Sequence, residues 1–133
     1  DPDADMGEHT FVYSLLPHDN DLIHSNVISE SNCLNQKPLF FEGFSSNSII
    51  PISLFGEGLE LIAFKKAEKE DCWIIRIVET HGRNSKGKLH LNGELIECNL
   101  IEWEELHDAL VIADELPISL SPFELKTFKL KFK

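Results

Sequence analysis

Cysteine is scarce in this chain of 133 residues. Cys33, Cys72 and Cys98 are the only three, and they lie at wide spacings without a Cys-x-x-Cys pair. The disulfide framework of a small secreted domain needs an even and denser set of cysteines, so the sequence predicts reduced thiols. We therefore expect an intracellular protein and assign it to the cytoplasm.

Basic residues and long apolar runs are also few. The chain has 12 Lys and Arg against 23 Asp and Glu, and its formal net charge is −11. Binding to nucleic acid depends on Lys and Arg that displace counterions from phosphates, and an anionic membrane surface attracts the same residues. No stretch approaches the ~18 consecutive apolar residues of a membrane-spanning helix. We expect neither nucleic acid nor a membrane as a partner.

Motifs for catalysis, metal binding or cofactor binding are missing. None of the six histidines stands in the His-x-His, His-x-Asp or His-Glu-x-x-His spacing of common zinc sites. There is no Gly-x-Ser-x-Gly segment, and Gly56-x-Gly58 lacks the third glycine of a dinucleotide loop. We assign no catalytic residue, metal ligand or cofactor to this chain, and its substrate-binding residues stay unknown. A carboxylate pair for glycoside hydrolysis stays open, because the chain has 23 acids.

The composition that remains is that of an ordinary globular domain, with 42% hydrophobic and 26% charged residues. One helix is expected over residues 21–35, where Ile23, Val27 and Leu34 recur at helical spacing. Elsewhere, short apolar runs alternate with turn residues about every 8–12 positions. The predicted fold class is mainly β: an antiparallel β-sandwich with one short helix near the N-terminus. We expect strands over residues 9–16, 39–44, 49–55, 59–66, 73–79, 88–91, 95–103, 109–113, 118–121 and 123–132.

Two hairpins are expected from the turn residues between these runs. Residues 69–71 (Lys-Glu-Asp) separate two strong strand patterns and should close a hairpin between them. Asn92-Gly93 is a strong two-residue turn signal, so we expect the strand before it to pair with the strand after it.

The last apolar run changes phase. Phe123 and Leu125 lie on odd positions, whereas Phe128 and Leu130 lie on even ones. A strand has a period of two, so one face of a regular strand cannot carry all four side chains. The sequence therefore predicts a β-bulge or bend near residues 126–127.

Arg76 is the polar residue that most needs a partner, because it lies inside the apolar run 73–79. A buried guanidinium without a partner is very costly. Glu79 projects to the opposite face of the strand, so we expect an acidic or carbonyl partner from another part of the chain. A ligand contact is the alternative. Four aromatic residues likewise admit two interpretations, packing in the core or a platform on which a sugar stacks: Tyr13, Phe41, Trp73 and Trp103.

Four segments together resemble glycoside hydrolase family 38, the α-mannosidases. Residues 1–18 (DPDADMGEHTFVYSLLPH) are similar to a segment that opens the C-terminal β-rich part of these enzymes, and residues 30–39 fit the helix and Asn-x-x-Pro-Leu that follow. Residues 75–83 (IRIVETHGR) are similar to the family's Arg-x-x-Glu-x-x-Gly strand and turn. Residues 121–128 (SPFELKTF) are similar to its closing strand. The chain departs from the family at Val78 and Cys33. The motif residues in this sequence are Arg76, Glu79, Gly82, Pro122, Phe123, Glu124 and Thr127.

The resemblance implies a role without chemistry of its own. Whole enzymes of this family are retaining hydrolases of α-mannosidic bonds, with an aspartate nucleophile and a divalent metal, usually zinc, in an N-terminal domain. His-x-Asp holds that metal with further Asp and His ligands. This chain has no His-x-Asp, so no catalytic or metal residue carries over to it. The resemblance implies that the parent protein is an enzyme and that this chain alone is not.

We therefore expect residues 1–8 to be a linker from the preceding part of the parent enzyme and residues 9–133 to be its C-terminal β-sandwich domain. The expected partners are the catalytic and middle domains of the parent, and carbohydrate (mannosides) through the parent. A homo-oligomer is open, and so is the linkage preference. The alternative is a free-standing carbohydrate-binding or interaction module.

Overall fold

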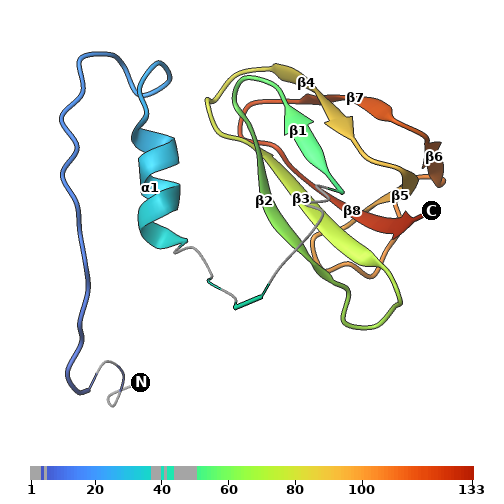
Figure 1. Cartoon of the computed structure of the whole chain (residues 1–133), viewed down its shortest axis with the longest axis horizontal. Coiled ribbons are helices and arrows are strands. Elements are labelled where there is room, and N and C mark those ends of the chain that lie inside the picture. The colour runs from blue at the N-terminus through green and yellow to red at the C-terminus, as the bar shows by residue number, and fades with distance from the viewer. Residues whose placement is uncertain (1–3, 5, 37–39, 41, 44–50) are drawn as a thin grey trace. The chain divides into compact units, whose positions relative to one another are not determined.

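The structure, a computed structural model of the whole chain, describes residues 4, 6–36, 40, 42–43 and 51–133. It divides into two compact units, Asp1–Glu42 and Gly43–Lys133. The first unit contains the helix α1 (Val27–Asn35), and the second contains all the strands of the described residues (Figure 1). The division into a linker over residues 1–8 and a domain over residues 9–133 stays a prediction.

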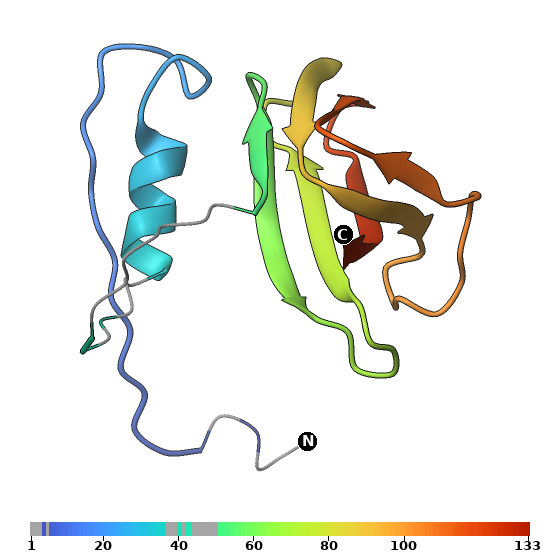
Figure 2. The ribbon, with the colours of Figure 1, turned by 45° about the vertical axis from the view of Figure 1, so that its right-hand side comes forward.

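The second unit is a sandwich of two antiparallel sheets, which confirms the predicted fold class. One sheet has three strands in the order β1-β4-β7, and the other has five in the order β2-β3-β8-β5-β6 (Figure 2). The chain passes from one sheet to the other at five of its connections, so most neighbours in sequence are not neighbours in a sheet. The strands are β1 (Ser53–Phe55), β2 (Leu59–Lys66), β3 (Trp73–Glu79), β4 (Ser85–His90), β5 (Gly93–Cys98), β6 (Leu110–Ile112), β7 (Glu115–Leu120) and β8 (Leu125–Phe132).

The hydrophobic core lies between the two sheets and follows the two-residue period of the strands. In β3, Ile75 and Ile77 are fully buried in this core, whereas Ile74 is fully buried outside it. The five-stranded sheet is therefore covered on both faces along its central strands. The other main contributors to the core are Leu89, Leu95, Ile118, Leu120, Phe128 and Leu130.

Strand β8 pairs regularly on both sides, so the predicted bulge near residues 126–127 is wrong. Its register against β3 runs from Leu125 to Leu130 without a shift, and its register against β5 is also unbroken. The phase change has another cause. Phe123 precedes the strand with a positive φ of 57°, and Leu125 lies on the face away from the core. The described strands do contain one shift of register, between Leu61 and Ala63 of β2.

The hairpin predicted at residues 69–71 is confirmed, because β2 and β3 pair across that turn. The hairpin predicted at Asn92-Gly93 is wrong: β4 pairs with β1 and β7, whereas β5 pairs with β6 and β8. Asn92 instead lies where the chain crosses between the sheets. Gly93 does not have the positive φ of a two-residue turn. A Cβ atom there would lie 2.4 Å from the Lys131 carbonyl oxygen, so Gly93 permits close approach of β5 to β8.

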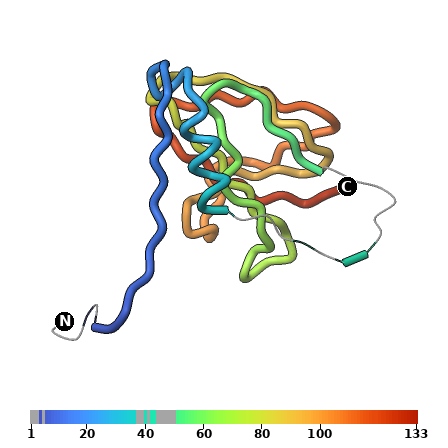
Figure 3. The backbone as a smooth tube through the Cα atoms, turned by 60° about the vertical axis from the view of Figure 1, so that its left-hand side comes forward, coloured from blue at the N-terminus to red at the C-terminus, as the bar shows by residue number. Residues whose placement is uncertain are grey.

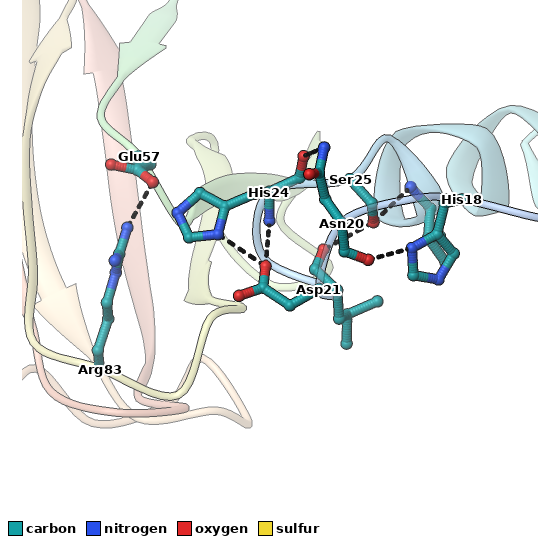
Figure 4. A network of polar contacts seen from close by, with 9 residues as sticks. His18, Asn20, Asp21, His24, Ser25, Glu57 and Arg83 are labelled. Carbon is teal, nitrogen blue, oxygen red and sulfur yellow. Dashed lines mark hydrogen bonds and ion pairs between the residues drawn. The ribbon is translucent and has the colours of Figure 1, made fainter.

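The first unit confirms a helix inside residues 21–35, although α1 begins only at Val27. Before it, Asp21 Oδ1 accepts hydrogen bonds from the backbone N–H and the Nδ1 of His24, at 2.9 and 2.7 Å (Figure 4). This side chain holds a turn in place of the first helical residues. An extended segment precedes this turn, and α1 follows it and runs in the opposite direction (Figure 3).

The strand predicted over residues 9–16 is not formed, because the described residues of the first unit offer it no neighbouring strand. The apolar side chains of this segment are exposed instead, among them Tyr13 at 85% and Leu15 at 89%. The strand predicted over residues 39–44, the start of the one over 49–55, and Phe41 fall largely or wholly outside the described residues.

The central position of β8 generates a stability prediction. Leu130 is fully buried in the core, so we expect Leu130→Ala to lower the free energy of unfolding by about 2–5 kcal/mol. Urea unfolding measures the change. The neighbouring Lys131 is exposed, and Lys131→Ala should change the free energy by less than about 0.5 kcal/mol. Equal effects of the two substitutions would contradict the placement of β8.

Candidate functional site

Glu79 forms the most highly connected polar site in the described residues. It ends β3, and only 1% of its surface is exposed. Oε1 accepts hydrogen bonds from the backbone N–H of His81 at 2.9 Å and from the Ser85 hydroxyl at 3.1 Å. Oε2 accepts from the backbone N–H groups of Gly82, Arg83 and Phe123, at 2.8, 3.3 and 3.0 Å. Both oxygens are therefore occupied by donors from the chain itself.

These donors set the charge of the Glu79 carboxyl. Burial alone would raise its pKa, because a charged group loses hydration in the interior. The hydrogen bonds from Phe123, His81, Ser85 and Gly82 outweigh burial and lower the pKa of Glu79 to about 2. The group is thus an ionised acceptor near neutral pH and holds no proton to donate as a general acid.

The same carboxylate lies where three connections between the sheets meet. Glu79 binds residues of the β3–β4 connection and, through Phe123, the β7–β8 connection. The β1–β2 connection joins them, because the backbone N–H of Thr80 donates to the carbonyl of Gly58 at 2.9 Å. The packing is close: a Cβ atom on Gly82, whose φ is 69°, would lie 2.7 Å from the Phe123 ring. This site therefore fixes one end of the sandwich.

An ion pair on the surface joins the same connections. Arg83 of the β3–β4 connection lies 2.5 Å from Glu57 of the β1–β2 connection, and both side chains are largely exposed (Figure 4). Exposed ion pairs contribute little to the free energy of unfolding. We therefore expect the hydrogen bonds of Glu79, and not this pair, to provide most of the stabilisation at this end of the sandwich.

The motif residues expected from the sequence fall into two groups. Glu79, Gly82 and Phe123 meet at the Glu79 site, and the turn that contains Pro122 is closed by Glu124, whose side chain accepts from the backbone N–H of Ser121 at 2.7 Å. Arg76 and Thr127 face each other in the register of β3 and β8 on the other face of the sheet. The structure brings no two of these motif residues together around an open cavity.

Arg76 has both kinds of partner that the sequence predicted. Its Nη2 donates to a carboxylate oxygen of Glu102 at 2.5 Å and to the carbonyl of Leu100 at 2.9 Å. Lys65 binds the same Glu102 carboxylate at 2.9 Å. Arg76 is 26% exposed and Glu102 only 11%, so the pair is largely buried. Glu102 also has a positive φ of 68°, which indicates that these contacts hold its backbone in a costly conformation.

Lys129 is a second paired cation on this face, and sequence reasoning missed it. Its side chain is only 6% exposed, and its Nζ lies 2.5 Å from Glu70 and 3.2 Å from Glu105. The hydrogen bond to Glu70 raises the pKa of Lys129, while burial opposes it. Lys129 thereby links the β2–β3 turn and the loop after β5. Its alternation with the core residues Phe128 and Leu130 was the available signal, because it places Lys129 on the face of Arg76.

Trp73 and Trp103, the two predicted aromatic residues that lie in the second unit, contact different partners. Trp73 stacks on Phe64 with 4.6 Å between the ring centroids and packs edge-on against Phe132. Trp103 is 62% exposed, with the Lys69 ammonium 3.6 Å from its ring centroid. The hollow beside Trp103 has a volume of about 20 Å³, enough for one water molecule and too small for a sugar ring.

Neither the cysteines nor any cluster of potential metal-binding side chains forms a second functional site in the described residues. Cys72 and Cys98 are buried, and burial raises the pKa of each thiol, whereas Cys33 is exposed; none forms a disulfide. Within the described ranges, no group of three or more His, Cys, Asp or Glu side chains could hold a metal ion. The described residues therefore offer no ligand set for the divalent metal that the resemblance implies. No helix among the described residues is long and apolar enough to cross a membrane.

Comparison with known proteins gives a consistent set of matches. The family model described as "Glycosyl hydrolases family 38 C-terminal beta sandwich domain" matches residues 58–128, which contain both Glu79 and Arg76. Alpha-mannosidase G of Dictyostelium discoideum is 30% identical over 142 residues, covering 97% of this chain and 13% of that protein. Alpha-mannosidase 2C1 of Homo sapiens is 30% identical over 135 residues, covering 94% of this chain and 13% of that protein. The chain thus spans a small part of the relatives it matches.

The low pKa of Glu79 predicts a pH dependence. A carboxyl with a pKa of about 2 in the folded chain, against an ordinary 4.5, stabilises the fold fully above about pH 4.5 and loses that contribution as the pH falls toward 2. We expect Glu79→Gln to lower the free energy of unfolding at pH 7, and the difference from the wild type to narrow below pH 4.5. Urea unfolding at several pH values tests this, with Glu68→Gln in the exposed β2–β3 turn as the control. A constant difference across this range would contradict the assignment.

The Arg76–Glu102 contact generates a second prediction for this site. Glu102→Ala removes the carboxylate shared by Arg76 and Lys65, and we expect the free energy of unfolding to fall by about 1–3 kcal/mol. Arg76→Met should cost less, because Glu102 keeps Lys65 and the methionine packs against the sheet. The exposed pair Lys66–Asp71 is the control, and Asp71→Asn should cost less than about 1 kcal/mol. Small and equal effects of all three substitutions would place Arg76 in solvent.

Proposed function

This chain belongs to the C-terminal beta-sandwich domains of glycosyl hydrolase family 38, and on that premise we propose that it is the non-catalytic C-terminal domain of an α-mannosidase. In this proposal, other parts of the parent protein hydrolyse α-mannosidic bonds of glycans with retention. The names of the relatives support the substrate class. The small share of their length that the chain covers, 13% in two of them, supports a domain within a larger enzyme.

One observation carries the non-catalytic role. The most prominent carboxylate of the family motif, Glu79, is ionised and accepts hydrogen bonds from five donors of its own chain. A general acid or a nucleophile must reach the substrate, and this carboxylate is turned inward instead. We propose that the domain supports the catalytic and middle domains of the parent. Walling part of the sugar cleft and holding subunits together are two finer roles for the same domain.

We assign the catalytic and metal-binding residues to other parts of the parent protein. The catalytic carboxylates and the zinc belong, in this proposal, to its catalytic domain, because the described residues of this chain offer the metal no ligand set. Cytoplasmic location is part of the proposal and is supported by three cysteines without a disulfide, one of them exposed.

A second function, a free-standing carbohydrate-binding or interaction module, is favoured by one residue. Trp103 is 62% exposed, and its backbone N–H donates a hydrogen bond to the side chain of Asn99 in the same loop. Exposed aromatic faces can stack on sugars. The hollow beside Trp103 is too small for a sugar ring, so this function is the alternative and not the main proposal.

Activity and metal content test the proposed function. We expect the full-length parent to hydrolyse an aryl α-mannoside and to contain zinc, because it would include the catalytic domain. The chain of residues 1–133, measured at the same molar concentration, should show neither activity nor stoichiometric metal.

Two outcomes would contradict this proposal. Hydrolysis by the 133-residue chain, or one tightly bound metal ion per chain, would mean that distant residues assemble a site of their own. An inactive parent, together with binding of a mannose disaccharide by the 133-residue chain that Trp103→Ala abolishes, would favour the carbohydrate-binding module.

A further inference from the structure

The extended segment before α1 exposes apolar side chains on both of its sides. Phe11, Tyr13 and Leu15 alternate with Val12 and Leu16, so each face of an extended chain would be apolar. The first four of these in sequence, Phe11 to Tyr13 and Leu15, are 78–89% exposed. An apolar alternation on both faces is typical of a strand that is covered on both sides, not of a surface loop.

The helix α1 covers only one end of this segment. Leu16 is 38% exposed and shares a groove of about 520 Å³ with Val27 and Leu34 of the helix. None of the helix residues is buried. The described part of the first unit therefore provides no strand to pair with residues 9–16, and its helix covers the segment only near Leu16.

The two sheets of the second unit offer poor edges for an added strand. The edge strands β1 and β6 have only three residues each. The edge strand β7 contains Pro117, which has no N–H to donate, and β2 contains a shift of register at its middle and two lysines at its end. Short length, proline, bulges and lysine are features that prevent a sheet edge from accepting another strand. Residues 9–16 therefore need an edge elsewhere.

We propose that residues 9–16 pair as a strand with an open sheet edge in a part of the parent α-mannosidase outside residues 1–133. The partner is a backbone edge with free N–H and C=O groups, flanked by an apolar layer on each side that takes the alternating side chains. This inference rests on the proposed function, because it requires a longer polypeptide. It assigns residues 9–16 to a sheet of a neighbouring domain and so makes them the attachment of this domain to its parent.

The extent of the sequence matches supports this partner. The family model covers residues 58–128 only, whereas the matches to whole α-mannosidases cover 94–98% of the chain. Nearly all of the chain, including the part before the sandwich, is therefore shared with proteins in which this chain corresponds to 13–14% of the length. A segment shared with such proteins fits a contact with the rest of them better than a contact peculiar to this chain.

Hydrogen exchange of the unmodified proteins tests the proposal. In the chain of residues 1–133, the amides of residues 11–16 should exchange at the rate of an unstructured peptide. In the full-length parent, we expect the same amides to exchange at least 100-fold more slowly, because strand pairing protects them. The measurement needs no substrate and no activity, so a failure of the proposed enzymatic function leaves its result interpretable.

A pair of substitutions gives an independent readout. Tyr13→Asp places a charge on one face of the proposed strand and should lower the Tm of the parent, while the Tm of the 133-residue chain stays unchanged. Ser29→Asp, at an exposed position of α1, is the matched control and should change neither Tm.

Three exchange results would overturn the inference. Fast exchange of residues 11–16 in the parent would mean that no strand forms. Protection in the isolated chain that is independent of concentration would assign the segment to an edge of its own sandwich. Protection that increases with concentration would assign it to a second copy of this chain.

Discussion

The fold depends on one buried negative charge. The Glu79 carboxylate accepts hydrogen bonds from four backbone N–H groups of two connections that lie far apart in sequence and from the hydroxyl of Ser85 at the start of β4. Without it, these part-buried N–H groups would lose their acceptor, which costs free energy wherever water cannot replace the lost hydrogen bond. The conformations of Gly82 and Phe123, both with positive φ, are those that aim their N–H groups at the carboxylate. A single side chain therefore joins two of the connections by which the chain crosses between the sheets at this end.

The two faces of the five-stranded sheet are covered in different ways. One face packs against the three-stranded sheet through apolar side chains, most of them aliphatic. The other carries Arg76 and Lys129, whose carboxylate partners Glu102 and Glu105 come from one loop after β5. Aliphatic packing tolerates rearrangement, whereas paired charges require defined geometry. The ionic face therefore helps to fix the loop that presents Trp103, whose regular backbone pairing is limited to a single β-bridge between Cys98 and Glu105.

Features that depend on the local residue pattern could be predicted from the sequence. Features that depend on contacts between segments far apart in the chain could not. The bounds of β2 and β3 and the turn between them follow from alternation and turn residues in one stretch of chain. Sheet membership does not: Asn92-Gly93 has the local signal of a hairpin, yet Leu89 and Leu95 reach the same core from opposite sheets. Likewise, the need of Arg76 for a partner was predictable, but the identity of Glu102, 26 residues away, was not. The N–H of Phe123, 44 residues from Glu79, is a similar case.

The position of β8 has a consequence for the order of events during synthesis. It is the last of the eight strands in the described residues, yet it lies in the middle of the five-stranded sheet, between β3 and β5. On a ribosome that adds about 5–20 residues per second, the hairpin β2–β3 and the pair β5–β6 can form early, but they have no edge in common until β8 emerges. Until then, the two pairs cannot join into one five-stranded sheet. The five-stranded sheet therefore forms as one unit only after β8 has been synthesised.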